Sequence, residues 1–270
     1  MREIISNILS YQFLTYGLIV GLCVSLCASI LGVILVLKRY SMIGDGLSHI
    51  SFGALALASV LGFAPLKVAI PLVAISAILL LRFGGKIIKG DSLIAIISSS
   101  ALAIGILLIS YFGSGTDMNS YLIGSLYAVE KSDAVFSVIL CLIVMAIFVF
   151  LYNRVFSVTF DEEFSRATGM KVNFYNTVIA ILVSVTVVIG MRLMGALLIS
   201  ALIVFPALSS MRVFKSFFSV TVSSVVISAF CFLTGFFLTI IFDSVPAGSA
   251  VTLVNLAVFI IFSVIGAVRK

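Results

Sequence analysis

The sequence has 270 residues, of which 63% are hydrophobic and only 10% are charged, and its mean hydropathy is +1.37. These values lie far outside the range of soluble domains, so we exclude a soluble domain of useful size and predict a multi-spanning membrane protein. We interpret the net charge of +6 as a topology signal, because basic residues of membrane proteins gather in cytoplasmic loops, and we expect no nucleic-acid partner.

Nine apolar runs separated by polar breaks are candidates to cross the lipid bilayer as helices, each of which needs about 20 residues. The runs cover residues 13–37, 43–62, 66–82, 92–112, 133–153, 174–191, 195–211, 217–241 and 249–267. They predict an all-α transmembrane helical bundle of eight to nine membrane helices, forming a single domain over residues 1–270. The second and seventh runs are rich in small or helix-breaking residues, so a broken or re-entrant helix is an alternative for both.

The basic residues fall mostly on one side of this predicted bundle. With the N-terminus outside, twelve lysines and arginines lie on one side and four on the other. The twelve are Lys38, Arg39, Arg82, Lys86, Lys89, Arg154, Arg166, Lys171, Arg212, Lys215, Arg269 and Lys270. The positive-inside rule makes these twelve cytoplasmic. It therefore predicts an outside N-terminus and a cytoplasmic C-terminus, which agrees with an odd number of spans.

The stretch KRYSMIGDGLSHISFG places two ionisable residues at the start of an apolar run. His49 is the only histidine of the chain and Asp45 precedes it by four positions, so on a helix their Cβ atoms lie roughly 5–6 Å apart on one face. A carboxylate and an imidazole at this spacing can bind one divalent cation, and ionisable groups inside a membrane usually mark a site. The structural alternative is that Asp45 stabilises the positive end of its helix and His49 hydrogen-bonds to a neighbouring carbonyl. Hydropathy places Asp45 near the cytoplasmic end of its span.

The cytoplasmic loop over residues 153–173, NRVFSVTFDEEFSRATGMKVN, is predicted to contain a short helix. The acidic run 161–163 suits the positive end of a helix, and Gly169 is placed to end it. Phe164 and Ala167 give this helix an apolar side, while its other side is charged. It is either a solvated cap on a loop or a docking element for a cytoplasmic motor protein.

The sequence lacks GxxxxGK(S/T), the loop that surrounds nucleotide phosphates, because the stretch GGKIIKGDS has the wrong spacing. We therefore assign any ATP chemistry to another subunit.

Five segments in sequence order resemble those of the membrane permease of bacterial ABC importers for zinc and manganese. They are KRYSMIGDGLSHISFG, YLIGSLYAV, FDEEFSRATGMKV, MGALLISALIVFPALSS and SVPAGSAV, and together they extend over nearly the whole chain. The resemblance implies a homodimer in the bacterial plasma membrane, bound on its cytoplasmic side to an ABC ATPase dimer. It also implies an extracytoplasmic metal-binding protein that supplies the cargo.

In this interpretation Asp45 and His49 face the translocation path and contact the transported Zn²⁺ or Mn²⁺, with Fe²⁺ as a further candidate, and there is no prosthetic group. Two such chains would supply four N/O ligands, a set that suits Zn²⁺ or, with water added, Mn²⁺. The cytoplasmic loop helix resembles the coupling helix that contacts the ATPase. Its predicted contact residues are Glu162, Glu163, Arg166, Ala167 and Gly169. The chain itself is then a transport permease and not an enzyme.

Two other functions remain open at this point. A permease for iron chelates or cobalamin would share the dimer, the ATPase and the coupling helix but would not need Asp45 or His49. A carrier driven by an ion gradient would use the same two residues as a proton relay. This second alternative leaves the cytoplasmic helix unexplained.

Overall fold

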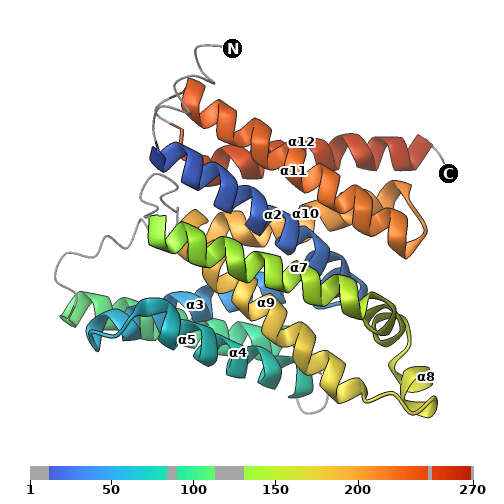
Figure 1. Cartoon of the computed structure of the whole chain (residues 1–270), viewed down its shortest axis with the longest axis horizontal. Helices are drawn as coiled ribbons and strands as arrows, with labels where there is room; N and C mark the ends of the chain where they lie inside the picture. Colours follow the sequence, from blue (N-terminus) through green and yellow to red (C-terminus); the bar gives the residue numbers. More distant parts are fainter. Residues whose placement is uncertain (1–11, 84–89, 113–130, 243–244, 269–270) are drawn as a thin grey trace.

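The computed structural model describes residues 12–83, 90–112, 131–242 and 245–268, and all regular structure within these ranges is helical (Figure 1). The helices are α2 (Gln12–Leu37), α3 (Ile43–Val60), α4 (Pro65–Phe83), α5 (Gly90–Phe112), α7 (Lys131–Phe160), α8 (Glu162–Ala167), α9 (Val172–Met194), α10 (Ala196–Val213), α11 (Phe217–Ile241) and α12 (Ala247–Val268). Each of the nine predicted spans coincides with one of the long helices, and α8 lies in the predicted cytoplasmic loop. The predicted all-α fold is therefore confirmed.

Eight helices of the described residues are long and apolar enough to cross a membrane. The remaining long helix, α4, has a shorter apolar part, Pro65–Leu81, and contains Pro71. Length and composition thus agree with the predicted eight to nine membrane helices. The motif YLIGSLYAV falls in residues 113–130, outside the described part of the chain.

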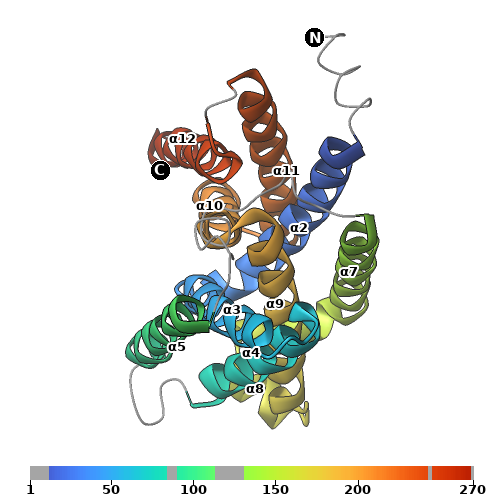
Figure 2. The ribbon, with the colours of Figure 1, turned by 90° about the vertical axis from the view of Figure 1, so that its left-hand side faces the viewer.

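The most buried helices form the centre of the bundle. Helices α2 and α9 bury most of their residues, whereas α5, α7 and α12 bury few. Figure 2 shows α2, α9 and α10 in the middle, with α5, α7 and α12 at the periphery. Because α5 and α12 are strongly apolar and poorly covered, their outer faces suit contact with lipid or with another apolar surface.

Small residues let the central helices approach closely. A Cβ atom added at Gly32 of α2 would clash with the backbone carbonyl of Ile203 of α10, so this contact requires glycine. Two serine hydroxyls of α11 donate hydrogen bonds to carbonyl oxygens of α2, Ser228 to Ser25 at 2.9 Å and Ser224 to Ser29 at 3.3 Å. Such hydrogen bonds between helices help to hold them together where no water is present.

Neither of the two runs that were candidates for a broken helix is broken. Helix α3 is continuous over 18 residues. Helix α10 continues through Pro206, and it is separated from α9 only by Gly195, whose φ of 88° needs glycine. The alternative of a broken helix is therefore wrong for both runs.

Candidate functional site

Helix α3 carries the predicted pair on its least buried side. Between residues 43 and 58, every residue is buried except Asp45, His49, Gly53 and Leu57. These four recur every fourth position, so they form one stripe along the helix. The rest of α3 is covered by α4, α5, α9 and α10. Gly53 lies against the backbone of Ala101 of α5, so an ion or another chain can reach the stripe at Asp45 and His49, whose side chains are partly exposed.

The structure brings the side chains of Asp45 and His49 together on this stripe. The Nε2 atom of His49 lies 3.6 Å from Oδ2 of Asp45, and their side chains are 28% and 49% exposed. Two ligands that each lie about 2.1 Å from a tetrahedral ion are about 3.4 Å apart. The two atoms are therefore spaced to bind one divalent cation with little rearrangement.

The structural alternative was that Asp45 stabilises the start of its helix and that His49 hydrogen-bonds to a carbonyl. The structure agrees with this alternative only for Asp45. Asp45 does lie in the first turn of α3, where the helix dipole favours a carboxylate. The Nδ1 atom of His49, however, is buried without a hydrogen-bond partner among the described residues, so the predicted bond to a carbonyl is absent from this nitrogen. Metal-binding imidazoles usually donate their second N–H to a fixed acceptor. Without one, the ring of His49 is positioned by packing and by Asp45 beside its Nε2 atom.

One chain supplies only part of a coordination sphere. Within the described residues, no group of three or more histidine, cysteine, aspartate or glutamate side chains is placed to hold a metal ion. The two ligands of α3 would therefore need partners from water or from another chain. Cys27, a buried thiol of α2, donates instead to the carbonyl oxygen of Cys141 at 3.3 Å.

The first turn of α3 packs against the middle of α10 and not against its end. A Cβ atom on Gly44 would lie 3.0 Å from Cδ1 of Ile203, and α10 continues from Ile203 to Val213. Those ten residues correspond to about 15 Å of helix. In Figure 1, the group formed by α3, α4 and α5 also stops short of the end where α8 lies. The turn of α3 that carries Asp45 therefore packs at the level of the middle of α10.

Helix α8 has the ends that the sequence predicted. Asp161 is the N-cap, and its Oδ1 accepts a hydrogen bond of 2.8 Å from the backbone N–H of Phe164. Gly169 follows the helix with φ of 80°, and backbone hydrogen bonds from Gly169 to Arg166 and from Met170 to Ser165 close the end. These local signals explain why a six-residue helix forms here.

The predicted apolar side of α8 is not covered by the chain itself. Phe164 is 64% exposed, and Glu163, Arg166, Ala167 and Gly169 are exposed as well. A phenylalanine exposed on a short charged helix is typical of a surface that another protein covers.

Glu162 differs from the other predicted contact residues because it is bonded within the chain. Its Oε1 accepts hydrogen bonds from Nζ of Lys38 at 2.5 Å and from Nδ2 of Asn176 at 3.1 Å. Burial by itself raises the pKa of the Glu162 carboxyl, but the hydrogen bonds from Lys38 and Asn176 outweigh it, so the pKa lies below its ordinary value. Glu162 is therefore ionised at neutral pH and fixes α8 against α2 and α9.

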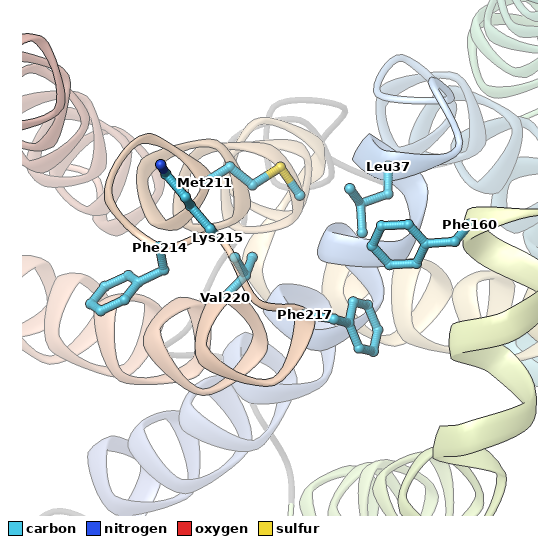
Figure 3. Close-up of a pocket in the computed structure, with 7 residues that line it drawn as sticks. All are labelled: Leu37, Phe160, Met211, Phe214, Lys215, Phe217 and Val220. Atoms are coloured by element: carbon cyan, nitrogen blue, oxygen red, sulfur yellow. The ribbon is translucent and has the colours of Figure 1, made fainter. Parts of the chain in front are cut away.

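An apolar pocket of about 330 Å³ opens beside α8 (Figure 3). Its seven side chains come from the ends of α2, α7, α10 and α11 and from the turn between the last two: Leu37, Phe160, Met211, Phe214, Lys215, Phe217 and Val220. Lys215 is the one charged residue among them. Since Phe160 directly precedes the N-cap of α8, the pocket and α8 belong to one surface.

Comparison with known proteins identifies the family. The model of the ABC 3 transport family matches residues 10–266. The chain belongs to this family. It is 30% identical over 262 residues to the manganese import system permease protein ScaB of Streptococcus gordonii, covering 97% of this chain and 94% of that protein. It is 27% identical over 226 residues to the high-affinity zinc uptake system membrane protein ZnuB of Buchnera aphidicola, covering 83% and 86%.

A solved structure gives the same result for the fold of this ABC-3 protein. PsaBC from Streptococcus pneumoniae in complex with Fab matches with a TM-score of 0.87 at 30% sequence identity, over 97% of this chain and 94% of the other. The predicted family resemblance is thus confirmed over nearly the whole chain.

Two residues of the ABC-3 chain that meet Glu162 were missed by the sequence analysis. Lys38 was counted only as a topology signal, and Asn176 was not noticed. The sequence offered one indirect sign, a lysine at the very start of the motif that carries Asp45. The sequence offered no sign that Lys38 pairs with Glu162 and Asn176, because Lys38 lies 124 positions from Glu162 and 138 from Asn176.

Proposed function

We infer that this chain is the permease subunit of an ATP-driven importer of divalent metal ions, with Zn²⁺ and Mn²⁺ as the leading candidates. The observation that carries this proposal is the stripe on α3, where Asp45 and His49 are 3.6 Å apart on a helix that is otherwise buried. The family match over residues 10–266 supports it. Relatives named for manganese and for zinc leave both metals open, since N/O ligands alone do not separate them.

The cargo ion would be held by two copies of the chain. Each copy contributes one carboxylate and one imidazole, which together make the four ligands of a tetrahedral site. No thiolate takes part, so the ion can leave more readily than from a structural zinc site. The ring of His49 lacks a fixed acceptor on Nδ1, which also suits transient binding. A cargo site must release its ion in every cycle.

The energy for transport would come from separate ATPase subunits on the cytoplasmic side. The exposed residues Glu163, Arg166, Ala167 and Gly169 of α8, together with Phe164 and the pocket that Phe160 lines, form the surface that these subunits would cover. ATP binding would move α8, and an extracytoplasmic protein would deliver the metal at the opposite end. This topology has the N-terminus outside and the C-terminus in the cytoplasm of a bacterial cell.

A permease for metal chelates is the second candidate, because it would use the same partners and a similar fold. It would need a wide path and no metal ligand on α3. The two proposals therefore differ in what they require of Asp45 and His49.

The test is ATP-dependent uptake of radioactive Zn²⁺ and Mn²⁺ into proteoliposomes that contain the chain and its ATPase partner. Asp45→Ala and His49→Ala are compared with Ser59→Ala, an exposed position of α3 outside the stripe. We expect both stripe variants to assemble and hydrolyse ATP yet to lose uptake, while Ser59→Ala transports normally. Unchanged uptake in both stripe variants would reject the metal site and favour the chelate permease.

A further inference from the structure

The cytoplasmic helix and the metal-binding motif meet at one buried lysine. Lys38 is the first residue of the motif that carries Asp45, seven positions before it, and it follows the last residue of α2. Its side chain is only 6% exposed. A buried ammonium group is costly unless it is paired, so the contacts of Lys38 are restricted to partners that can compensate its charge.

Three polar side chains close a triangle around this ammonium group. Nζ of Lys38 donates to Oε1 of Glu162 at 2.5 Å and to Oδ1 of Asn176 at 2.9 Å. Nδ2 of Asn176 donates to the same Oε1 atom at 3.1 Å. These three residues, which we name the α8 node, join the end of α2, the first residue of α8 and the start of α9. Because each of the three bonds to both others, a shift of α8 must either move Lys38 or break these hydrogen bonds.

The chain between the α8 node and Asp45 has little freedom to absorb such a shift. Backbone N–H groups of Arg39 and Tyr40 donate to the carbonyls of Val36 and Leu35 at 3.0 and 2.8 Å, which is the pattern of a Schellman helix end. The N–H of Ile43 then donates to the carbonyl of Tyr40 at 3.0 Å, and α3 begins. The connection is therefore a tight, hydrogen-bonded turn.

Arg39 occupies this turn with φ of 63°, and it is the only non-glycine residue with positive φ among the described residues. Such a conformation persists only where the surroundings enforce it. Lys38 of the α8 node directly precedes Arg39 in the chain, and burial, followed by the negative charge of Glu162, raises the pKa of the Tyr40 hydroxyl in the same turn. The turn is thus bound to the α8 node on one side.

Packing against α10 also connects the end of α2 with the start of α3. Ile203 of α10 lies against both Gly32 of α2 and Gly44 of α3. A displacement of the end of α2 is therefore passed to the first turn of α3 by the turn and by this shared contact. Contiguous packed and hydrogen-bonded elements of this kind can couple distant sites.

We propose that the α8 node is the link through which movement of α8 reaches Asp45 and His49, so that Lys38 is a positioning residue for transport. This inference rests on the proposed function, because it assumes that α8 contacts the ATPase and that the pair on α3 holds the cargo. It assigns Glu162 to the inner side of α8, as the anchor of the link, and leaves the contact with the ATPase to the other residues of the helix.

The test compares metal uptake with ATP hydrolysis in the same proteoliposomes, using the complete complex. Lys38→Met removes the charge and keeps the length of the side chain. We expect ATP hydrolysis to be retained while metal transported per ATP falls about tenfold. The exchange Lys38→Glu with Glu162→Lys recreates the ion pair and should restore most of the ratio. Asn176→Ala, which only opens the triangle, is a milder variant in case Lys38→Met fails to assemble, and we expect a smaller fall in the same ratio.

The matched control is the other described pair between a lysine or arginine and a carboxylate. Arg192 of α9 donates to Asp133 of α7 at 2.8 Å, and it lies far from α8 along α9. Arg192→Met should leave the metal transported per ATP unchanged. If Lys38→Met or Asn176→Ala lowers metal uptake and ATP hydrolysis equally, the α8 node only stabilises the structure. The same conclusion follows if the exchange of Lys38 and Glu162 does not restore the ratio.

The outcome also separates this inference from the proposed function. If Asp45→Ala abolishes uptake but Lys38→Met transports normally per ATP, the metal site stands and the link is rejected. If Asp45→Ala and His49→Ala both transport normally, the proposed function is rejected whatever Lys38→Met does.

Discussion

Replacing Gly53 by alanine tests whether α3 and α5 are in backbone contact. A Cβ atom at Gly53 would lie 2.5 Å from the carbonyl oxygen of Ala101, and one at Gly105 would lie 2.9 Å from Cα of Gly53. Ordinary contact begins near 3.4 Å, so Gly53→Ala forces the helices apart by almost 1 Å. A backbone carbonyl inside a helix cannot rotate away, so the strain falls on the packing of α3.

Two opposing effects decide the magnitude. Overpacking of a tight contact costs about 1–3 kcal/mol, and a clash with backbone belongs at the upper end. Alanine is favoured over glycine in a helix by about 1 kcal/mol. We therefore expect Gly53→Ala to lower the free energy of unfolding by about 1–2 kcal/mol. Since His49 lies one turn away on the same stripe, metal uptake should fall as well.

The buried cysteines provide the assay. Cys27, Cys141 and Cys231 are buried, so a thiol-reactive fluorophore reports thermal unfolding of the purified protein. Ser59→Ala, exposed on the same helix, is the control and should melt like the wild type. A Gly53→Ala protein that melts at a higher temperature than the wild type would show only the gain in helix propensity, and would refute close contact between α3 and α5.

Three further outcomes concern the turns and the α8 node. Arg39→Gly should raise the free energy of unfolding by about 1 kcal/mol in the same melting assay, because it removes a side chain from a left-handed conformation. Gly169→Ala should lower it by about 1 kcal/mol for the same reason, since nothing lies within 4 Å of the added Cβ. Because the pKa of Glu162 is lower in the folded protein, its contribution to stability is complete above the ordinary carboxyl pKa of 4.5 and is lost as the pH falls further. Melting of wild type and Glu162→Gln should accordingly differ at pH 7 and converge below pH 4.5.

Most of the fold could be predicted because its signals are local. A membrane helix needs an uninterrupted apolar run, and each of the nine runs can be recognised from its own residues alone. The ends of α8 are equally local, since Asp161 caps the N–H of a residue three positions later and Gly169 supplies the positive φ after the last turn. The i,i+4 spacing likewise predicted that Asp45 and His49 share a face.

The α8 node could not be predicted because it depends on tertiary contacts. The side chain of Lys38 looks like any basic residue at a cytoplasmic helix end, and the positive-inside rule explains it fully. Only the position of α8 against α2 and α9 pairs its buried ammonium group with the half-exposed carboxylate of Glu162. The same holds for Glu162, which the sequence analysis treated like Glu163 although its carboxylate, 45% exposed, is bonded to Lys38 and Asn176. A short helix has several charged residues, and which of them turns inward is decided by what lies beneath it.

Hydropathy alone could not predict which part of the bundle the first turn of α3 contacts. Hydropathy counts residues along the chain and assumes that each span begins at the membrane surface. Here the tight turn at Arg39 starts α3 directly after α2, and the absence of a side chain on Gly44 lets that first turn pack against Ile203, about 15 Å of helix from the end of α10. If Asp45 and His49 hold the cargo, the ion therefore binds near the level of the middle of α10 and not at its end. A permease that alternates between two openings needs its ion at such a level, because a site at either surface would be open to one side at all times.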